Sequence, residues 1–212
     1  MNELHSARIA AAAGEPLASA LGAVIMLHGR GDSASGILQF SEAITVPGVA
    51  YVAPQAADNT WYPDSFLAPL ESNEPWLSSA LQAVGGVLEQ VGEAGIPPVR
   101  VVLLGFSQGA CLATEFAARN ATRYGSVVGL SGGLIGHDGT PRDYKDSLDG
   151  TPVFLGCSDI DAHIPVERVH ETARVLESLN AQVEKRIYPG MGHTINEDEV
   201  ERVRALLQGV LV

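Results

Sequence analysis

Short runs of apolar residues recur along the chain, and segments whose apolar positions have helical spacing lie between them. The runs cover residues 23–27, 49–53, 101–104, 127–130, 153–155 and 183–187. Continuous apolar runs of this length are typical of strands that are buried on both faces of a parallel sheet. Their alternation with helical segments predicts an α/β protein whose mostly parallel central sheet is covered by helices on both faces.

Two helices are especially clear in this pattern. Apolar residues at helical spacing mark the first one: Trp76, Leu77, Ala80, Leu81, Val84, Val87, Leu88 and Val91. Gly95 and Pro97 predict its end. A similar pattern over 200–210 predicts a last helix close to the C-terminus. No internal repeat or low-complexity linker interrupts the chain, so we expect one domain over residues 1–212.

The segment 55–75 is long for a connection between a strand and a helix. It holds several large apolar side chains, among them Trp61, Tyr62 and Phe66. Long ordered loops commonly carry function, so we expect these three residues to form an apolar pocket wall for an acyl or alcohol group. The alternative is a loop that only packs its aromatic side chains on the sheet. A wall of this kind predicts a modest pocket, suited to short or medium acyl groups.

The stretch "LLGFSQGA", residues 103–110, places Ser107 between two glycines at the end of an apolar run. The residues that follow supply an apolar helical surface, so the chain must turn from strand to helix within a few residues. Glycines at 105 and 109 leave room for a sharp turn that holds the serine hydroxyl exposed at its tip. This context predicts a nucleophile elbow. The alternative is an ordinary glycine-rich turn with a capping serine.

A serine hydroxyl is a poor nucleophile at neutral pH, so it needs a base and a partner that orients the base. His193 lies in the glycine-flanked stretch "YPGMGHTI", between an alternating apolar segment and a helix start. Asp159 and Asp161 lie in the loop after the run 153–155. The chain order Ser, Asp, His is that of α/β-hydrolases. All three positions follow strand ends, so we expect Ser107, an aspartate and His193 to form a catalytic triad.

The two aspartates are both candidates for the acid of this triad. We favour Asp161, because the acid should lie far enough beyond its strand to reach a histidine on the neighbouring loop. Asp159 would then cap or brace the loop. His163 is a second candidate base, but it lies only two residues after Asp161, which favours a role in loop packing or at the edge of the substrate.

Backbone donors for a tetrahedral oxyanion are also expected in such an enzyme. One candidate is the backbone N–H of Gln108, directly after the predicted nucleophile. The second should come from an earlier strand end, where "AVIMLHGRGDSASG" supplies a glycine-rich turn. We expect the backbone N–H of Arg30 to be this donor. His28, in the same turn, is expected to be a structural hydrogen-bonding residue rather than a base.

The net charge of the chain bears on which classes of macromolecule it could bind. Its 13 basic and 25 acidic side chains give a formal net charge of −12. This balance argues against nucleic acid or an anionic membrane as a partner, and it is also compatible with a salt-rich habitat. The N-terminal stretch "IAAAAGEPLASALGAVIML" lacks the pattern of a signal peptide or a membrane span, because Glu15 and Pro16 interrupt it.

The two cysteines, Cys111 and Cys157, are expected to be free buried thiols. Free thiols are typical of a reducing compartment, so we expect a cytoplasmic protein. Two other arrangements stay open, since the cysteines could pair if the sheet brought them together, and the protein could be a monomer or a homodimer.

Four motifs in order, "LHGRGD", "GFSQGA", "DAHIP" and "GMGHTI", resemble the carboxylesterase and acyl-protein thioesterase branch of the α/β-hydrolases. The resemblance covers most of the chain. It implies an α/β-hydrolase fold without a large cap domain, and a serine esterase that needs no cofactor and no metal. It also implies Ser107 as nucleophile, His193 as base and Asp161 as its partner, with the Arg30 and Gln108 amides as oxyanion hole.

The resemblance departs from the branch at two places. Members that handle long acyl chains usually carry leucine where this chain has Arg30. The loop that supplies the acid has two aspartates before its histidine in this chain, whereas the pattern of those members is shorter. Both departures weaken the expectation of palmitoyl-protein or lysophospholipid substrates. The expected function is hydrolysis of short to medium-chain acyl esters through an acyl-serine intermediate. The expected substrates are small molecules. The alternatives are an acyl thioesterase or lysophospholipase, and a hydrolase fold that binds a small molecule without catalysis.

Overall fold

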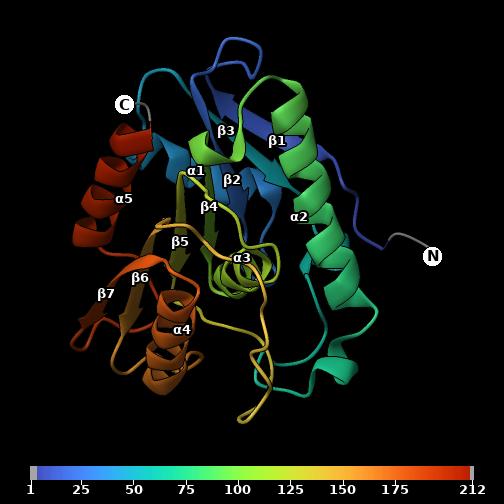
Figure 1. Ribbon diagram of the computed structural model, residues 1–212, viewed down its shortest axis with the longest axis vertical. Coiled ribbons are helices and arrows are strands. Elements are labelled where there is room, and N and C mark those ends of the chain that lie inside the picture. The colour runs from blue at the N-terminus through green and yellow to red at the C-terminus, as the bar shows by residue number, and fades with distance from the viewer. Residues whose placement is uncertain (1–3, 211–212) are drawn as a thin grey trace.

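The computed structural model describes residues 4–210, and in this part of the chain seven strands form one sheet (Figure 1). The strands are β1 (Ile9–Gly14), β2 (Gly22–Leu27), β3 (Val49–Pro54), β4 (Val101–Phe106), β5 (Ser126–Leu130), β6 (Pro152–Ser158) and β7 (Gln182–Tyr188). Their order across the sheet is β1-β3-β2-β4-β5-β6-β7. Only the edge pair β1 and β3 is antiparallel, so the predicted mostly parallel sheet is confirmed.

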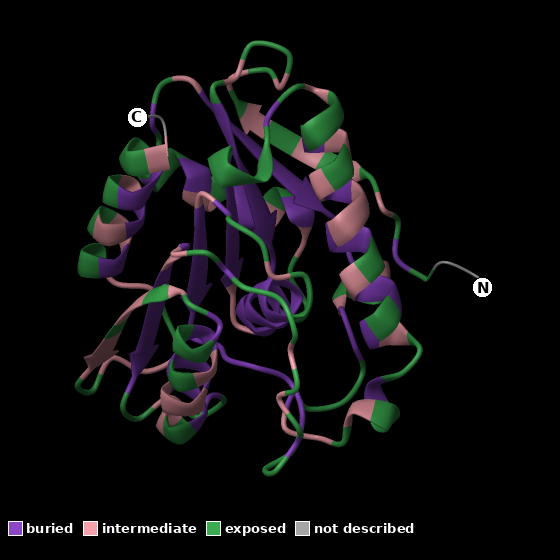
Figure 2. Ribbon diagram, viewed as in Figure 1, coloured by how far each residue is buried: buried purple, intermediate pink, exposed green. Residues whose placement is uncertain are grey.

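Helices cover both faces of this sheet, as the alternating pattern predicts. They are α1 (Ala34–Ala43), α2 (Trp76–Glu93), α3 (Gln108–Arg119), α4 (Val166–Ser178) and α5 (Glu197–Val210). One apolar cluster joins α2, α3 and α4 to one face, and a second joins α1 and α5 to the other. The central strands and α3 are almost entirely buried between these layers (Figure 2). Burial on both faces explains why these strands are continuous apolar runs rather than alternating ones.

The strand β1 is the one element of the sheet that the apolar pattern misses. Its sequence is IAAAAG, and its residues alternate between half-buried and exposed positions. Alanine has the highest helix propensity and is depleted in strands, so the segment carries little strand signal of its own. It is a strand because it pairs with β3, with Ala12 opposite Val52. This contact is made between distant parts of the chain.

The parallel arrangement brings four loops to one edge of the sheet. β2, β4, β6 and β7 all run in the same direction, so the loops that follow them leave the sheet at their carboxyl ends. These loops hold Arg30, Ser107, Asp161 and His193, respectively. Ligands of open α/β sheets bind at this edge. The fold therefore places the four predicted segments where a shared site can form.

The segment 55–75 contains two short 3₁₀ turns, Ala57–Asn59 and Leu70–Asn73, and is otherwise irregular. It adds no layer to the fold, and no large cap domain covers the carboxyl edge of the sheet in residues 4–210. Both cysteines are buried and free, as predicted. Burial raises the pKa of each thiol to about 12, so both stay protonated at neutral pH.

Candidate active site

Ser107 lies at the tip of a sharp turn between β4 and α3. Its φ of 56° and ψ of −120° are rare for a residue with a side chain, and such backbone strain is characteristic of functional sites. Neither of the glycines that flank Ser107 could carry a side chain, because a Cβ would collide with nearby backbone atoms. A Cβ at Gly109 would lie 2.0 Å from the carbonyl oxygen of Leu27, and one at Gly105 would lie 2.1 Å from the carbonyl oxygen of Gly109. The geometry is that of the predicted elbow.

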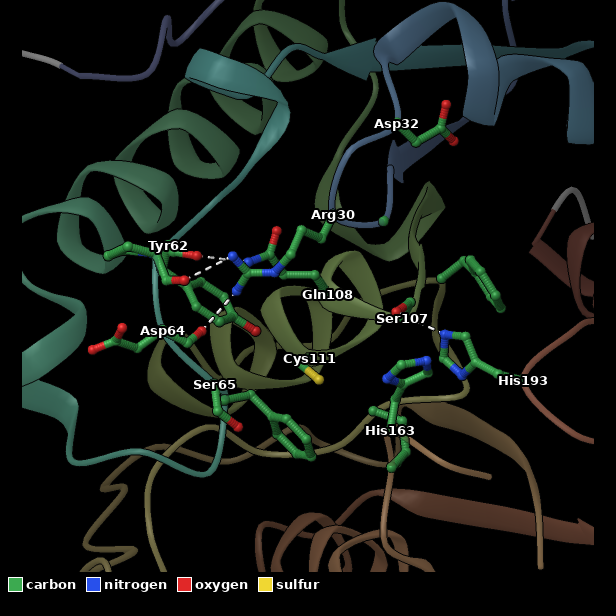
Figure 3. Close-up of a pocket in the computed structure, with 15 residues that line it drawn as sticks. Arg30, Asp32, Tyr62, Asp64, Ser65, Ser107, Gln108, Cys111, His163 and His193 are labelled. Atoms are coloured by element: carbon green, nitrogen blue, oxygen red, sulfur yellow. Dashed lines mark hydrogen bonds between the residues drawn. The ribbon is translucent and has the colours of Figure 1, made fainter. Parts of the chain in front are cut away.

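The side chains of Ser107, His193 and Asp161 form a continuous chain of hydrogen bonds. His193 Nε2 lies 2.9 Å from Ser107 Oγ, and His193 Nδ1 lies 2.7 Å from Asp161 Oδ2 (Figure 3 shows the serine and the histidine). A carboxylate can only accept, which assigns the imidazole proton to Nδ1. Nε2 is then the acceptor for the serine hydroxyl. The structure thus brings together three residues that are 54 and 32 positions apart in the sequence.

The carboxylate of Asp161 is held rigidly in this arrangement. Its Oδ1 accepts from the backbone N–H groups of His163, at 2.8 Å, and Ile164, at 3.1 Å. The side chain is fully buried, and burial alone would raise its pKa. The hydrogen bonds from His193 and the two amides outweigh burial and hold the pKa of Asp161 below its usual value. A carboxylate that stays ionised and fixed can orient the imidazole of His193.

Asp159 does not touch the histidine side chain. Its Oδ1 accepts from the backbone N–H of Gly190 at 2.8 Å, and the neighbouring Ser158 Oγ accepts from the N–H of Gly192 at 3.0 Å. Both contacts tie the loop that carries His193 to the end of β6. The geometry therefore matches the favoured alternative, in which Asp161 faces the histidine and Asp159 braces a loop.

Two other aromatic rings lie next to the imidazole of His193. The centroid of Phe106 is 5.0 Å away, and that of His163 is 4.8 Å away in an edge-on arrangement. The side chain of His163 is exposed and lines the same cavity as Ser107 (Figure 3). Its position agrees with the expected role at the edge of a substrate and not with that of a second base.

The turn after β2 lies directly beside the serine. A Cβ on Gly29 would lie 3.5 Å from the Cβ of Ser107. Gln108 is the first residue of α3, where backbone N–H groups have no partner within the helix. The turn that carries Arg30 and the start of α3 at Gln108 therefore both lie next to Ser107.

His28 is buried and has the structural contacts expected of it. Its Nδ1 donates to the carbonyl of Gly29 at 2.8 Å, and its Nε2 accepts from the N–H of Ala56 at 3.2 Å. Burial lowers the pKa of His28, so its ring is neutral at neutral pH. The ring therefore supports the turn rather than taking part in proton transfer.

A cavity of about 570 Å³ opens beside Ser107 (Figure 3). Tyr62 and Phe66 line it, as expected, together with Phe106 and Ile164. Trp61, expected in the same wall, is not part of it. Its ring is fully buried and lies tilted against the ring of His28, with the centroids 4.9 Å apart, and its indole N–H donates to the backbone carbonyl of His28 at 2.9 Å. The prediction for Trp61 is wrong because the hydrogen bond and the apolar core turn its ring inward.

The loop that supplies this wall is held by the candidate site itself. The side chain of Gln108 accepts from the N–H of Trp61 at 3.0 Å and donates to the carbonyl of Tyr62 at 2.8 Å. The guanidinium of Arg30 donates to the carbonyls of Pro63 and Asp64. Both side chains therefore position the loop, a role that the sequence pattern did not indicate.

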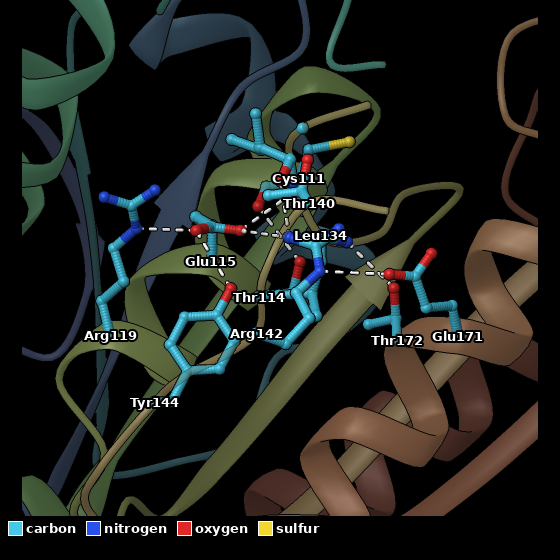
Figure 4. A network of polar contacts seen from close by, with 12 residues as sticks. Cys111, Thr114, Glu115, Arg119, Leu134, Thr140, Arg142, Tyr144, Glu171 and Thr172 are labelled. Carbon is cyan, nitrogen blue, oxygen red and sulfur yellow. Dashed lines mark hydrogen bonds and ion pairs between the residues drawn. The ribbon is translucent and has the colours of Figure 1, made fainter. Parts of the chain in front are cut away.

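A buried polar network surrounds Glu115 (Figure 4). Glu115 of α3 is buried and accepts from Arg119, from Tyr144 and from the backbone N–H of Ile135. The N–H of the next residue, Gly136, donates to the carbonyl of Phe66. A buried carboxylate needs several donors to offset its loss of hydration, so this network fixes the segment that holds Phe66.

The helix that follows the His193 loop begins with a reciprocal pair of hydrogen bonds. Asn196 Oδ1 accepts from the N–H of Glu199, and Glu199 Oε2 accepts from the N–H of Asn196, each at 2.9 Å. Glu199 is fully buried, and its Oε1 has no hydrogen-bond partner within residues 4–210. This oxygen packs on Gly156 of β6, where a Cβ would lie 2.0 Å from it. Burial raises the pKa of Glu199 from 4.5 to about 7.

This shift predicts a dependence of stability on pH. The unfolded chain releases the Glu199 proton near pH 4.5 and the folded chain near pH 7, so stability falls as the pH rises between these values. The Glu199→Gln variant lacks this proton and keeps an acceptor for Asn196. We expect its free energy of unfolding at pH 8 to exceed that of the wild type by up to about 3 kcal/mol, with the difference shrinking towards pH 5.

Urea unfolding at pH 5 and pH 8 measures both free energies. Glu201→Gln, at an exposed position of the same helix, is the matched control and should keep the pH dependence of the wild type. An equal difference between Glu199→Gln and the wild type at both pH values would contradict the assignment.

Within residues 4–210, no helix has the length and apolar character needed to cross a membrane. In the same range, no group of three or more His, Cys, Asp or Glu side chains is arranged to hold a metal ion.

Comparison with known proteins places the chain in a family. The model of the phospholipase/carboxylesterase family matches residues 10–211. A crystal structure of a phospholipase/carboxylesterase from Dyadobacter fermentans is 41% identical, with a TM-score of 0.91, over 98% of this chain and 100% of that one. The crystal structure of esterase PE8, at 23% identity and a TM-score of 0.77, covers 94% of this chain and 97% of its own and shows the same fold.

Curated relatives carry a related name. Acyl-protein thioesterase 1 of Debaryomyces hansenii is 25% identical over 100% of this chain and 99% of its own length. Acyl-protein thioesterase 1 of Gibberella zeae is 33% identical over 58% of this chain, and this match spans about half of the relative, 53% of its length. The family match over nearly the whole chain, on a fold shared with a 41% identical family member, decides the assignment: the chain belongs to the phospholipase/carboxylesterase family of serine hydrolases, within the α/β-hydrolase superfamily.

Proposed function

We propose that this protein is a serine carboxylesterase that hydrolyses short to medium-chain esters of small molecules through an acyl-serine intermediate. The observation that carries the proposal is the unbroken hydrogen-bonded chain Ser107–His193–Asp161, with bonds of 2.9 and 2.7 Å, on a strained turn beside a cavity. This combination of hydroxyl, imidazole and carboxylate is the arrangement that activates a serine for acyl transfer.

In the first half of the proposed reaction, Ser107 Oγ attacks the ester carbonyl carbon. His193 Nε2 takes the hydroxyl proton as the new C–O bond forms, and Asp161 stabilises the resulting imidazolium through Nδ1–H. The negative charge on the carbonyl oxygen is bound by the backbone N–H groups of Gln108 and Arg30, where it is stabilised most strongly in the transition state. The C–O bond to the alcohol then breaks, and the alcohol leaves with the proton from His193.

In the second half, water replaces the alcohol. His193 takes a proton from water, the hydroxide adds to the acyl carbon, and the tetrahedral intermediate uses the same two amides. Its collapse breaks the bond to Ser107 Oγ, which regains its proton from His193, and releases the carboxylic acid. Every step uses groups of this chain, so the proposed reaction needs no cofactor or metal.

The wall of the cavity argues for acyl groups of limited length. Three aromatic residues bound the cavity, Tyr62, Phe66 and Phe106. The wall residue Phe66 is fixed by the N–H of Gly136, and Tyr62 by the side chain of Gln108, so the wall is tethered at both residues. A tethered wall limits expansion of the pocket for a long chain.

A thioesterase is the second candidate, because the curated relatives are named acyl-protein thioesterases. The same acyl-serine intermediate forms from an oxygen ester or from a thioester, and the difference lies in the leaving group. The chain could also bind a small ester without turnover, which would make it a receptor on a hydrolase fold.

A substrate panel separates these functions. The panel comprises 4-nitrophenyl esters from acetate to hexanoate, the palmitate ester, and the butyryl and palmitoyl thioesters of coenzyme A. The proposal predicts the highest kcat/KM for butyrate or hexanoate and a lower value for both thioesters. Higher kcat/KM for a thioester would favour the second candidate, and binding of butyrate ester without release of 4-nitrophenol would favour the receptor.

A further inference from the structure

One positive charge lies in the wall of the candidate site without an anionic partner. This charge belongs to Arg30, which is exposed and lines the same cavity as Ser107. Its guanidinium donates to two neutral backbone oxygens, that of Pro63 at 2.8 Å and that of Asp64 at 2.7 Å. A guanidinium has five N–H groups, so three remain for another acceptor.

The carboxylates nearest in the sequence do not neutralise this charge. Among residues 4–210, none lies within 4.0 Å of the Arg30 guanidinium, whereas Arg119, Arg142 and Arg168 each form ion pairs at that distance. Asp32 and Asp64 line the same cavity, but Figure 3 shows the side chain of Asp64 directed away from the guanidinium and that of Asp32 on another side of the turn. The charge of Arg30 is therefore available inside a chain whose net charge is −12.

The guanidinium is also held in place before any ligand binds. Its carbon lies 5.9 Å from the centroid of the Tyr62 ring, within the range of a cation–π contact. Tyr62 itself is buried, and its backbone carbonyl is held by Gln108. Two hydrogen bonds and one ring contact restrict the long side chain, so little rotational freedom is lost when an anion binds.

An unsubstituted alkyl chain would gain nothing from this group. A guanidinium beside an alkyl chain loses part of its hydration without a compensating contact, whereas a carboxylate or another oxyanion forms charge-assisted hydrogen bonds with it. We propose that Arg30 forms a subsite for an anionic substituent, and that the preferred substrates are esters whose acyl or alcohol part carries a carboxylate or a similar oxyanion. This inference rests on the proposed esterase function and specifies its substrate class.

Two pairs of esters test the subsite and locate it. On the acyl side, mono-4-nitrophenyl adipate is compared with 4-nitrophenyl methyl adipate, in which the carboxylate is masked. On the alcohol side, 4-(hexanoyloxy)benzoate is compared with its methyl ester. Rates without enzyme are subtracted, because a free carboxylate can accelerate hydrolysis of its own ester. The readout is the ratio of kcat/KM for the anionic ester to that for the uncharged ester within each pair.

Arg30→Gln removes the charge while keeping a donor for the loop carbonyls, and Arg30→Lys keeps the charge without the forked geometry. We expect Arg30→Gln to lower the ratio roughly 10- to 100-fold for one of the two pairs, the effect of losing hydrogen bonds to a charged group, and Arg30→Lys to lower it less. The pair that responds shows on which side of the ester the anion binds. Arg100→Gln removes an exposed charge before β4, at the opposite end of that strand from Ser107, and should leave both ratios unchanged.

The ratio separates the subsite from the reaction, since any effect of residue 30 on the shared chemistry changes both members of a pair. If Arg30→Gln lowers both members of both pairs by the same factor, the subsite does not exist and the esterase function stands. If the wild type hydrolyses none of the four esters, and none of the 4-nitrophenyl esters of the first panel, the proposed function itself is wrong.

Discussion

Replacing Ser107 by alanine is expected to lower kcat for 4-nitrophenyl butyrate by about 10⁴-fold or more. The variant loses the oxygen that forms the proposed acyl intermediate, while the pocket and the backbone N–H groups remain, so a small rate above that of water should persist. The hydrogen-bond partner of Ser107 Oγ is His193 Nε2, and His193 is half-buried, so removal of the hydroxyl leaves this nitrogen within reach of solvent. Release of 4-nitrophenol under saturating ester measures kcat directly.

The fold should survive this change. Alanine has a Cβ like serine, so the strain of the positive φ at position 107 is the same in both proteins. The thermal unfolding midpoint and the far-UV spectrum of Ser107→Ala are therefore expected to match those of the wild type. A folded Ser107→Ala variant that keeps a tenth or more of the wild-type kcat would rule out the proposed nucleophile.

Replacing Asp161 by asparagine is expected to have the second largest effect, a loss of about 10⁴-fold in kcat. An asparagine amide can donate to His193 Nδ1, which would move the ring proton to Nε2 and leave no acceptor for the Ser107 hydroxyl. The two backbone N–H donors of His163 and Ile164 can still bind the amide oxygen, so the loop should stay in place. Kinetics with 4-nitrophenyl butyrate at pH 7.5 measure the loss.

Asp159→Asn is the matched control, because the two aspartates share one loop. Asparagine can still accept from the N–H of Gly190, so the brace of the His193 loop is kept and kcat should change only slightly. A large loss in Asp159→Asn together with a small loss in Asp161→Asn would reverse the assignment of the two residues.

The positions of the candidate triad were predictable because each follows a strong local signal. Ser107 lies at a strand end between two glycines, at which any side chain would collide with backbone atoms. The loops of Asp161 and His193 follow strands β6 and β7, respectively. Because the carboxyl ends of parallel strands lie at the same edge of a sheet, the parallel arrangement alone brings these loops together. The choice between Asp159 and Asp161 has no such local signal, because it depends on the direction of each side chain in one tight loop.

The features that sequence reasoning missed depend on contacts between distant segments. Trp61 and Tyr62 are adjacent and both aromatic, yet Trp61 packs against His28 in the core and Tyr62 lines the cavity. The side chain of Gln108 is fixed by the loop that it holds, and nothing in the local pattern indicates that. The strand β1 exists through its pairing with β3. Such outcomes follow from tertiary packing, which a local pattern does not contain.

The site on which an organophosphonate reacts is the most direct test of the account. A fluorophosphonate loses fluoride to the attacking oxygen, so intact mass spectrometry of the treated protein followed by peptide mapping identifies the nucleophile. We predict one phosphonyl group per chain, on Ser107, and slow or absent labelling of the His193→Ala variant. A wild-type protein that turns over esters yet carries the label on another residue, or labels at the same rate without His193, would contradict the proposed mechanism.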